Sequence, residues 1–153
     1  MHPPVLFLDI DGVLIAFPEG EPTAPQFTPQ CVEALKVVIA AVPRLQIVFS
    51  TTWRLGEHVN RLHSEWLAHR LPIAITRDGT PDTREDPSVP RIHRRGREIE
   101  AWLAAHPGVS RWAVIDDDRL AIEPILSATR CVFTDPARGM DTGHAERLIA
   151  ILC

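Results

Sequence analysis

Two short apolar runs of the sequence end in aspartates. Asp9 and Asp11 follow the first run, and Asp116 and Asp117 follow a run near residue 115. In an open parallel sheet the carboxyl ends of the strands share one edge, where ligands bind. Clustered carboxylates are costly unless a cation neutralises them, and ligand sets made only of oxygen suit Mg²⁺. The two acidic strand ends, Asp9 with Asp11 and Asp116 with Asp117 and Asp118, therefore predict a metal site at this edge, and Mg²⁺ is the ion that suits it.

Other interpretations of these aspartates fit less well. Two aspartates around a turn could simply cap a helix, but a second acidic strand end argues against this. An EF-hand loop is excluded because Gly12 is the fourth residue from Asp9 rather than the sixth. A dinucleotide-binding site is excluded because no G-x-G-x-x-G follows the first apolar run. A receiver domain is disfavoured because its acidic pair would come first in the chain, whereas here the pair comes late, and no lysine follows the fifth expected strand.

The elements that must position these side chains alternate along the chain. Apolar runs interspersed with segments of helical periodicity are typical of an α/β fold with helical crossovers. We expect a three-layer, Rossmann-like α/β fold with a mainly parallel five-stranded sheet and helices on both faces. The expected strands are residues 5–9, 45–50, 71–76, 111–116 and 130–134, and the expected helices are 29–42, 57–69, 95–106 and 141–152. Loops are expected at residues 18–29 and 77–90, which leaves room for only a minimal cap.

The length and composition of the chain predict a single domain, residues 1–153. Apolar residues make up 45% of the chain and charged residues 24%, as in ordinary globular proteins. The formal net charge of -4 gives no electrostatic support for binding to nucleic acid or to an acidic membrane. Cys31, Cys131 and Cys153 form no paired motif, and neither a signal peptide nor a membrane-spanning run is present. A cytoplasmic protein is expected, and its oligomeric state stays open.

Four motifs, in order, resemble those of the haloacid dehalogenase (HAD) superfamily. The first, residues 6–14, reads Leu-Phe-Leu-Asp-Ile-Asp-Gly-Val-Leu and resembles the D-x-D-G motif. Residues 48–53, Val-Phe-Ser-Thr-Thr-Trp, resemble the second motif, in which a Ser or Thr closes a strand. Residues 95–99 resemble the third, where a cation opens a helix, and 114–117 resemble the fourth, with its paired acids. Residues 51–54, 95–99 and 134–140 further resemble small, cap-poor members, some of which occur in RNA-repair proteins.

This resemblance implies a Mg²⁺-dependent phosphoric monoester hydrolase. Asp9 would be the nucleophile that forms an aspartyl-phosphate, and Asp11 would be the general acid and base. The metal would be held by Asp9, the Asp11 carbonyl and Asp116, with Asp117 orienting them. Thr51 would donate a hydrogen bond to a phosphoryl oxygen, and Arg95 would be the cation in place of the usual lysine. Gly12, Thr52 and Arg94 would be further substrate contacts. Ser50 and Thr52 are alternatives to Thr51, and Arg94 and Arg97 are alternatives to Arg95.

The substrate and some roles stay open. A minimal cap leaves the site open, which suggests a phosphate on something large or an accessory chain that completes the pocket. One alternative function is a polynucleotide end-processing phosphatase, which the subgroup resemblance favours and the acidic net charge disfavours. Another is a catalytically silent binding module, which would not need to keep Asp9, Asp11 and Asp116. Trp53 could form a wall of the phosphate pocket or lie in the core.

Overall fold

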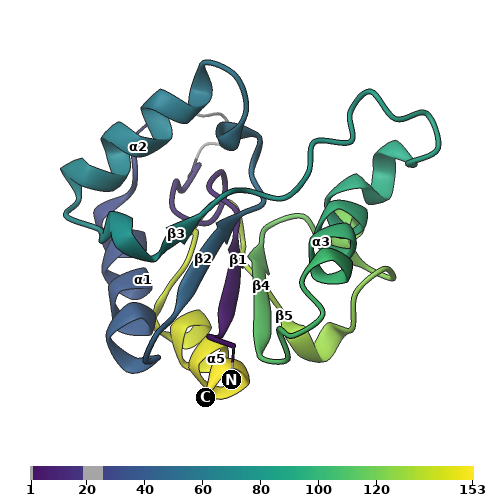
Figure 1. Ribbon diagram of the computed structural model, residues 1–153. Helices are drawn as coiled ribbons and strands as arrows, with labels where there is room; N and C mark the ends of the chain where they lie inside the picture. The colour runs from purple at the N-terminus through teal and green to yellow at the C-terminus, as the bar shows by residue number, and fades with distance from the viewer. Residues whose placement is uncertain (1, 19–25) are drawn as a thin grey trace.

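Five parallel strands form one sheet in the order β3-β2-β1-β4-β5 (Figure 1). The structure is a computed structural model that describes residues 2–18 and 26–153. The central strand is β1, flanked by β2 and β4, and β3 and β5 are the edges. The strands are β1 (Val5–Leu8), β2 (Gln46–Phe49), β3 (Thr76–Arg77), β4 (Trp112–Asp116) and β5 (Cys131–Phe133). The predicted α/β, Rossmann-like architecture is confirmed.

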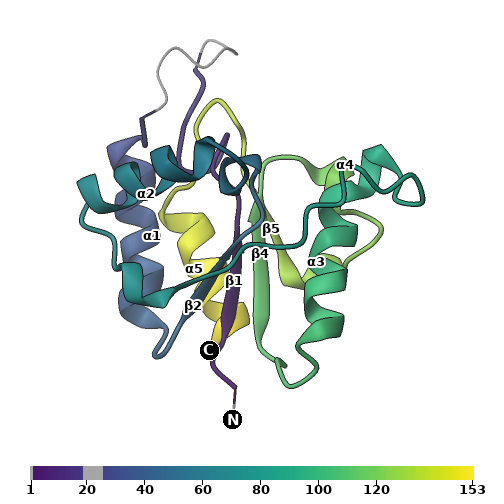
Figure 2. The ribbon, with the colours of Figure 1, turned by 45° about the horizontal axis from the view of Figure 1, so that its top comes forward.

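Helices cover both faces of this sheet and make three layers (Figure 2). Because side chains alternate along a strand, Leu6 and Leu8 pack toward one face and Val5 and Phe7 toward the other. The first face packs against α1 (Pro29–Ala41), α2 (His58–Ala68) and α5 (Thr142–Leu152). The second face packs against α3 (Arg94–Ala105) and the short α4 (Arg119–Ile122). Parallel strands that are buried on both faces have nearly continuous apolar sequences, which is why the runs were recognisable from the sequence.

The helix ends follow local signals. Pro29 is the first residue of α1, where its missing amide hydrogen costs nothing. Asp141 caps α5, because its carboxylate accepts a hydrogen bond from the His144 amide and His144 Nδ1 accepts one from the Asp141 amide. Thr28 precedes α1 but does not cap it through its side chain; its hydroxyl accepts a hydrogen bond from the Ala16 amide instead. Thr28 thereby ties the start of α1 to the segment that follows Asp9 and Asp11.

The third strand is much shorter than predicted. Residues 73–75 form a 3₁₀ helix, η2 (Ile73–Ile75), and only Thr76 and Arg77 pair with β2. The reason lies in the two preceding residues. The Leu71 amide donates to the Trp66 carbonyl and the Pro72 carbonyl accepts from the Trp66 indole, so both residues are held by α2. Pro72 also has no amide hydrogen to donate to a sheet.

The segments that follow β2 and β3 border the carboxyl edge of the sheet. The predicted loop at residues 18–29 falls partly on residues 19–25, which lie outside the described residues. Residues 78–90 contain no helix or strand, and two 3₁₀ helices border the site: η1 (Thr52–Arg54) and η3 (Arg91–His93). Within the described part of the chain, no helix is long and apolar enough to cross a membrane.

Candidate active site

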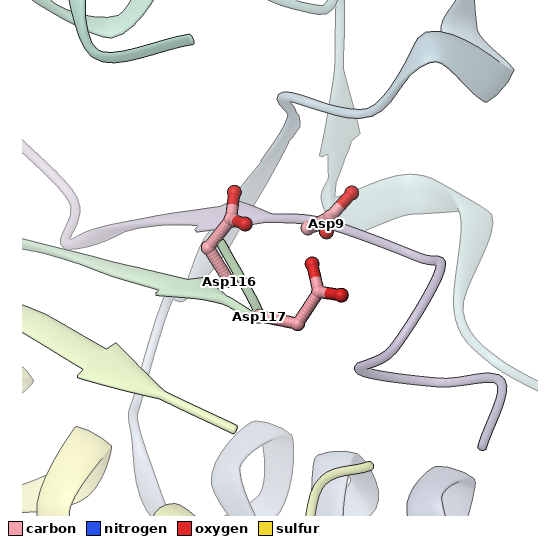
Figure 3. A group of neighbouring side chains, drawn as sticks. All are labelled: Asp9, Asp116 and Asp117. Carbon is pink, nitrogen blue, oxygen red and sulfur yellow. The ribbon is translucent and has the colours of Figure 1, made fainter. Parts of the chain in front are cut away.

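Three carboxylates meet at the carboxyl edge of the sheet (Figure 3). Asp9 directly follows β1, Asp116 ends β4, and Asp117 follows it. One oxygen from each of the three lies within 4.8 Å of the others. Asp9 is 2% exposed and Asp116 is fully buried. Adjacent parallel strands therefore bring together acids that lie more than a hundred residues apart in the sequence.

Gly12 makes room for this cluster. Its backbone has a φ of 75°, a conformation that favours glycine. A Cβ at this position would overlap the Asp117 carboxylate. The Gly12 carbonyl accepts a hydrogen bond from the Thr134 hydroxyl at 2.6 Å, which fixes the turn after β1 against the end of β5. Gly12 thus shapes the site, and its predicted substrate contact stays a prediction.

The buried carboxyls of this cluster resist ionisation. Burial, followed by the charge of Asp116, raises the pKa of Asp9 well above its usual value. Burial also raises the pKa of Asp116 to about 6, although Arg95 opposes this shift. Nearby positive charge stabilises the ionised forms of such acids, so the cluster has the chemistry of a cation site.

Arg95 supplies one positive charge from the first turn of α3. Its guanidinium Nη1 lies 2.9 Å from Asp116 Oδ1 and 3.5 Å from Asp9 Oδ2. Burial alone would lower the pKa of Arg95, but Asp9 and Asp116 raise it overall, so the group stays charged. Its neighbours differ: Arg97 is exposed and pairs with Glu100, and the buried Arg94 Nε has no partner among the described residues. Of these three arginines, Arg95 is the one in contact with the carboxylates.

Asp11 lies beside the cluster and is held by Trp53. The Trp53 indole donates to Asp11 Oδ1 at 3.2 Å, and the Asp11 side chain is not one of the three clustered carboxylates. Burial raises the pKa of Asp11, and the hydrogen bond from Trp53 opposes that rise. Trp53 is 9% exposed and also packs against Phe27. Trp53 is therefore both a core residue and a contact of the predicted general acid.

The structure separates the three candidate hydroxyls after β2. The Thr51 hydroxyl accepts a hydrogen bond from the Trp53 amide at 3.2 Å and so caps η1. The Ser50 hydroxyl is buried and has no partner among the described residues. Thr52 is exposed and lines the adjacent cavity together with Ser50. The role of Thr51 as hydrogen-bond donor to the phosphoryl group stays a prediction. The Ser50 hydroxyl, which is unpaired in the described part of the chain and faces the cavity, is better placed for that role.

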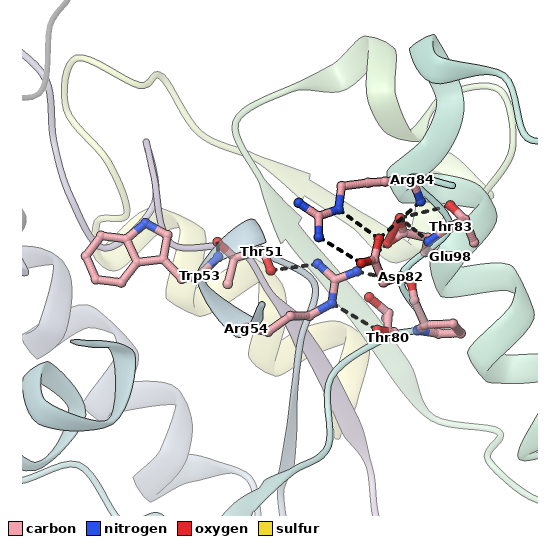
Figure 4. Close-up of polar contacts among 9 residues, drawn as sticks. Thr51, Trp53, Arg54, Thr80, Asp82, Thr83, Arg84 and Glu98 are labelled. Carbon is pink, nitrogen blue, oxygen red and sulfur yellow. Dashed lines mark hydrogen bonds and ion pairs between the residues drawn. The ribbon is translucent and has the colours of Figure 1, made fainter. Parts of the chain in front are cut away.

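Sequence reasoning gave no role to a buried ion pair that braces this region (Figure 4). Arg54 and Glu98 lie 2.5 Å apart, with 7% and 5% of their side chains exposed. Arg54 also donates to the carbonyls of Thr51, Thr80 and Pro81. Both partners lie in stretches that carried the family resemblance, but 44 residues separate them, and nothing in the sequence pairs them.

A cavity of about 360 Å³ opens next to the carboxylates. It is bordered by the end of β2, the 84–98 region and the start of α4, and Arg95 lies both in its wall and against Asp9. Five of its lining residues are arginines, and its remaining residues are polar, acidic or aliphatic. They are Ser50, Thr52, Arg54, Leu55, Arg84, Arg91, Ile92, Arg94, Arg95, Glu98, Asp118, Leu120 and Ala121.

The fold and the site together define an α/β protein with an acidic centre at its central strand ends. Residues 5–145 match a family described as "HAD domain in Swiss Army Knife RNA repair proteins". Because the match covers most of the chain, the protein belongs to this family of HAD domains, as its motifs predicted. HAD domains are generally hydrolases of the phosphatase type. Searches of curated proteins and of solved structures found no match to the chain.

Proposed function

We propose that this protein is a Mg²⁺-dependent phosphoric monoester hydrolase that acts through an aspartyl-phosphate on Asp9. The observation that carries this proposal is the position of Asp9: buried, beside Asp116, and 3.5 Å from the guanidinium of Arg95. A carboxylate held among charges of both signs at a strand end can attack a phosphorus atom and be regenerated. A silent binding module would have no need of this costly arrangement.

The donor set fits a magnesium ion. Asp9, Asp116 and Asp117 supply carboxylate oxygens close enough to share one cation, and the Asp11 carbonyl would complete the protein ligands. Asp117 offers its own oxygen to the shared site, so it would act as a ligand as well as an orienting group. When bound, Mg²⁺ would shield the carboxylates from the negative charge of the incoming phosphate.

The residues of the chain would then divide the reaction. An Asp9 oxygen forms a bond to phosphorus as the bond to the leaving oxygen breaks, and Asp11 donates the proton that the leaving oxygen takes. Water then attacks the aspartyl-phosphate, Asp11 accepts its proton, and inorganic phosphate leaves with Asp9 restored. Trp53 keeps Asp11 oriented for both proton transfers.

Two groups would bind the transferred phosphoryl oxygens. Arg95 remains charged and can offer the planar, multiple N–H contacts that a lysine cannot. The Ser50 hydroxyl is buried at the cavity wall and has no hydrogen-bond partner in the described part of the chain, so it can donate to a phosphoryl oxygen. We therefore assign the phosphoryl hydrogen bond to Ser50 in preference to Thr51.

A second candidate is the removal of phosphate from polynucleotide ends. Two observations favour it: the family is named for RNA-repair proteins, and arginines line the cavity beside Asp9. The net charge of -4 describes the whole chain and not this cavity. Both candidates share the chemistry on Asp9 and differ only in the substrate.

The proposal is tested by turnover of a substrate panel with and without Mg²⁺. The panel contains an aryl phosphate, small sugar phosphates, and 3′- and 5′-phosphorylated oligonucleotides, each assayed for phosphate release in Mg²⁺ and in EDTA. We expect Mg²⁺-dependent release from at least one class. Preference for oligonucleotide ends would favour the second candidate, and no release from any substrate would refute the hydrolase proposal.

A further inference from the structure

The cavity beside Asp9 carries more positive charge than one phosphoryl group requires. Among its five arginines, Arg95 neutralises Asp116, Arg54 is bound to Glu98, and Arg84 is bound by Asp82. Two arginines, Arg91 and Arg94, remain. Within the described residues, no hydrogen bond or ion pair holds either guanidinium.

Within the described residues, the two carboxylates of the cavity wall form no ion pair with Arg91 or Arg94. Glu98 is engaged by Arg54 and by the Thr83 hydroxyl. Asp118 caps α4, because its Oδ1 accepts a hydrogen bond from the Ala121 amide. The guanidinium groups of Arg91 and Arg94 are therefore available to an anion that enters the cavity.

Arg94 points to an anion for a second reason. Its Nε is buried without a partner, as is the Ser50 hydroxyl in the same cavity. Buried polar atoms of folded proteins are rarely left without a hydrogen bond, so an unpaired one calls for a partner such as a water molecule, an ion or a ligand. A phosphate offers several acceptor oxygens to a guanidinium and can satisfy more than one N–H at once.

We propose that Arg91 and Arg94 form a second phosphate subsite, so that the preferred substrate carries a second phosphate near the one that is removed. The inference rests on the proposed function, because the first phosphate is the one bound by Arg95 and attacked by Asp9. Ile92 and Leu120 line the same cavity with 58% and 67% of their surfaces exposed, and they can contact the organic part of the substrate. The second phosphate is either a free monoester or a backbone diester of a nucleotide chain.

Kinetics on matched substrates test the subsite. The kcat/KM in Mg²⁺ is compared for adenosine 3′,5′-bisphosphate, for the 3′- and 5′-monophosphates, and for a 3′-phosphorylated dinucleotide. We expect the bisphosphate or the dinucleotide to exceed the better monophosphate by about 10-fold or more. Preference for the bisphosphate identifies a free second phosphate, and preference for the dinucleotide identifies a backbone diester.

Variants assign this preference to the two arginines. The double variant Arg91→Gln/Arg94→Gln should lose most of the preference, whereas Arg97→Gln, on the same helix but outside the cavity, should keep it. Circular dichroism and thermal unfolding check that the double variant is folded. Equal kcat/KM for singly and doubly phosphorylated substrates, or a preference that survives in the double variant, would overturn the subsite.

A binding measurement separates this inference from the proposed function. Isothermal titration of the Asp9→Asn variant with the same four compounds reads the subsite without any turnover. If the wild-type protein hydrolyses nothing, the hydrolase proposal fails, yet at least about 10-fold tighter binding of the bisphosphate or the dinucleotide than of the monophosphates would still support the subsite. Equal binding of all four compounds by this variant would refute it.

Discussion

Ser50 and Asp9 are the first residues beyond two paired strands, and they occupy matching positions. Leu8 and Phe49, the last residues of β1 and β2, are partners in the sheet, and the Ser50 amide donates to the Leu8 carbonyl at 3.0 Å. A shift of one residue along a strand turns a side chain to the other face. Thr51, one residue further, turns its hydroxyl to the amide of Trp53.

This relationship predicts different defects for two neighbouring substitutions. Ser50→Ala should lower kcat/KM by about 100-fold, as the loss of one preorganised donor does in other enzymes. Thr51→Ala should instead lower the free energy of unfolding by about 1 kcal/mol through the lost cap, with a smaller effect on kcat/KM. Aryl phosphate kinetics and urea unfolding of both variants check this. The opposite order of kinetic effects would return the role to Thr51.

The contact between Trp53 and Asp11 predicts a shift in the pH profile. The indole hydrogen bond lowers the pKa of Asp11 against the effect of burial, so Trp53→Phe should raise that pKa. Because Asp11 must be protonated to act as the general acid, the alkaline limb of kcat/KM should move to higher pH. Trp66→Phe, which removes an indole bound to the Pro72 carbonyl, is the matched control and should leave the limb in place. A limb that does not move in Trp53→Phe contradicts the role of Asp11.

The ion pair of Arg54 and Glu98 predicts a large loss of stability. Glu98→Ala leaves the buried guanidinium of Arg54 without its charge partner. Burial lowers the pKa of Arg54 and Glu98 opposes this effect, so the charged form of Arg54 loses its main support in the variant. We expect a loss of about 3 kcal/mol in the free energy of unfolding, which urea denaturation measures. Glu100→Ala on the same helix breaks an exposed pair with Arg97, and it should cost less than about 1 kcal/mol. Equal losses would mean that the pair does not brace the site.

Magnesium should raise the melting temperature in a pH-dependent manner. The raised pKa values mean that the ionised carboxyls of Asp9 and Asp116 destabilise the metal-free fold. The contribution of Asp116 to stability is present below the ordinary pKa of 3.8 and is lost as the pH rises through about 6, and the pKa of Asp9 is shifted in the same direction. A metal binds the ionised forms, so its stabilising effect should be larger at about pH 7.5 than at about pH 5.

Thermal unfolding with and without Mg²⁺ measures this effect, and neighbouring aspartates provide the control. Asp116→Asn should abolish the shift, whereas Asp118→Asn should keep it, because Asp118 caps α4 outside the cluster and Asn caps equally well. A shift of the same size in both variants would place the ion elsewhere.

The strands that carry the site were predictable, whereas the exact register of their ends was not. The run that ends at Asp9 is buried on both faces, so its apolar residues identify it without any tertiary information. The edge strand β3 was not predicted correctly. The sequence around Ile73 is typical of a strand, but the Trp66 indole binds the Pro72 carbonyl, and residues 73–75 form η2 instead of pairing with β2. The choice between Ser50 and Thr51 likewise depends on the η1 turn, which sequence periodicity does not reveal.

Long-range polar partners were also beyond the sequence. The acidic strand ends predicted the cluster because strand order alone brings Asp9 and Asp116 together. No such rule joins Arg54 to Glu98, or Trp53 to Asp11, since strand order does not place η1 against α3 or against the turn after β1. The positive charge of the cavity was hidden in the same way, because a net charge sums over the whole chain.

The most direct test of the account is the turnover of Asp9→Asn beside that of Asp118→Asn. Both variants replace one carboxylate at the carboxyl edge of the sheet, but of the two only Asp9 lies against Arg95 and within the cluster. With Mg²⁺ and the best substrate of the panel, we predict that Asp9→Asn falls to the background rate and that Asp118→Asn retains most of the wild-type rate. Turnover by folded Asp9→Asn at a rate close to that of the wild type would show that Asp9 is not the nucleophile.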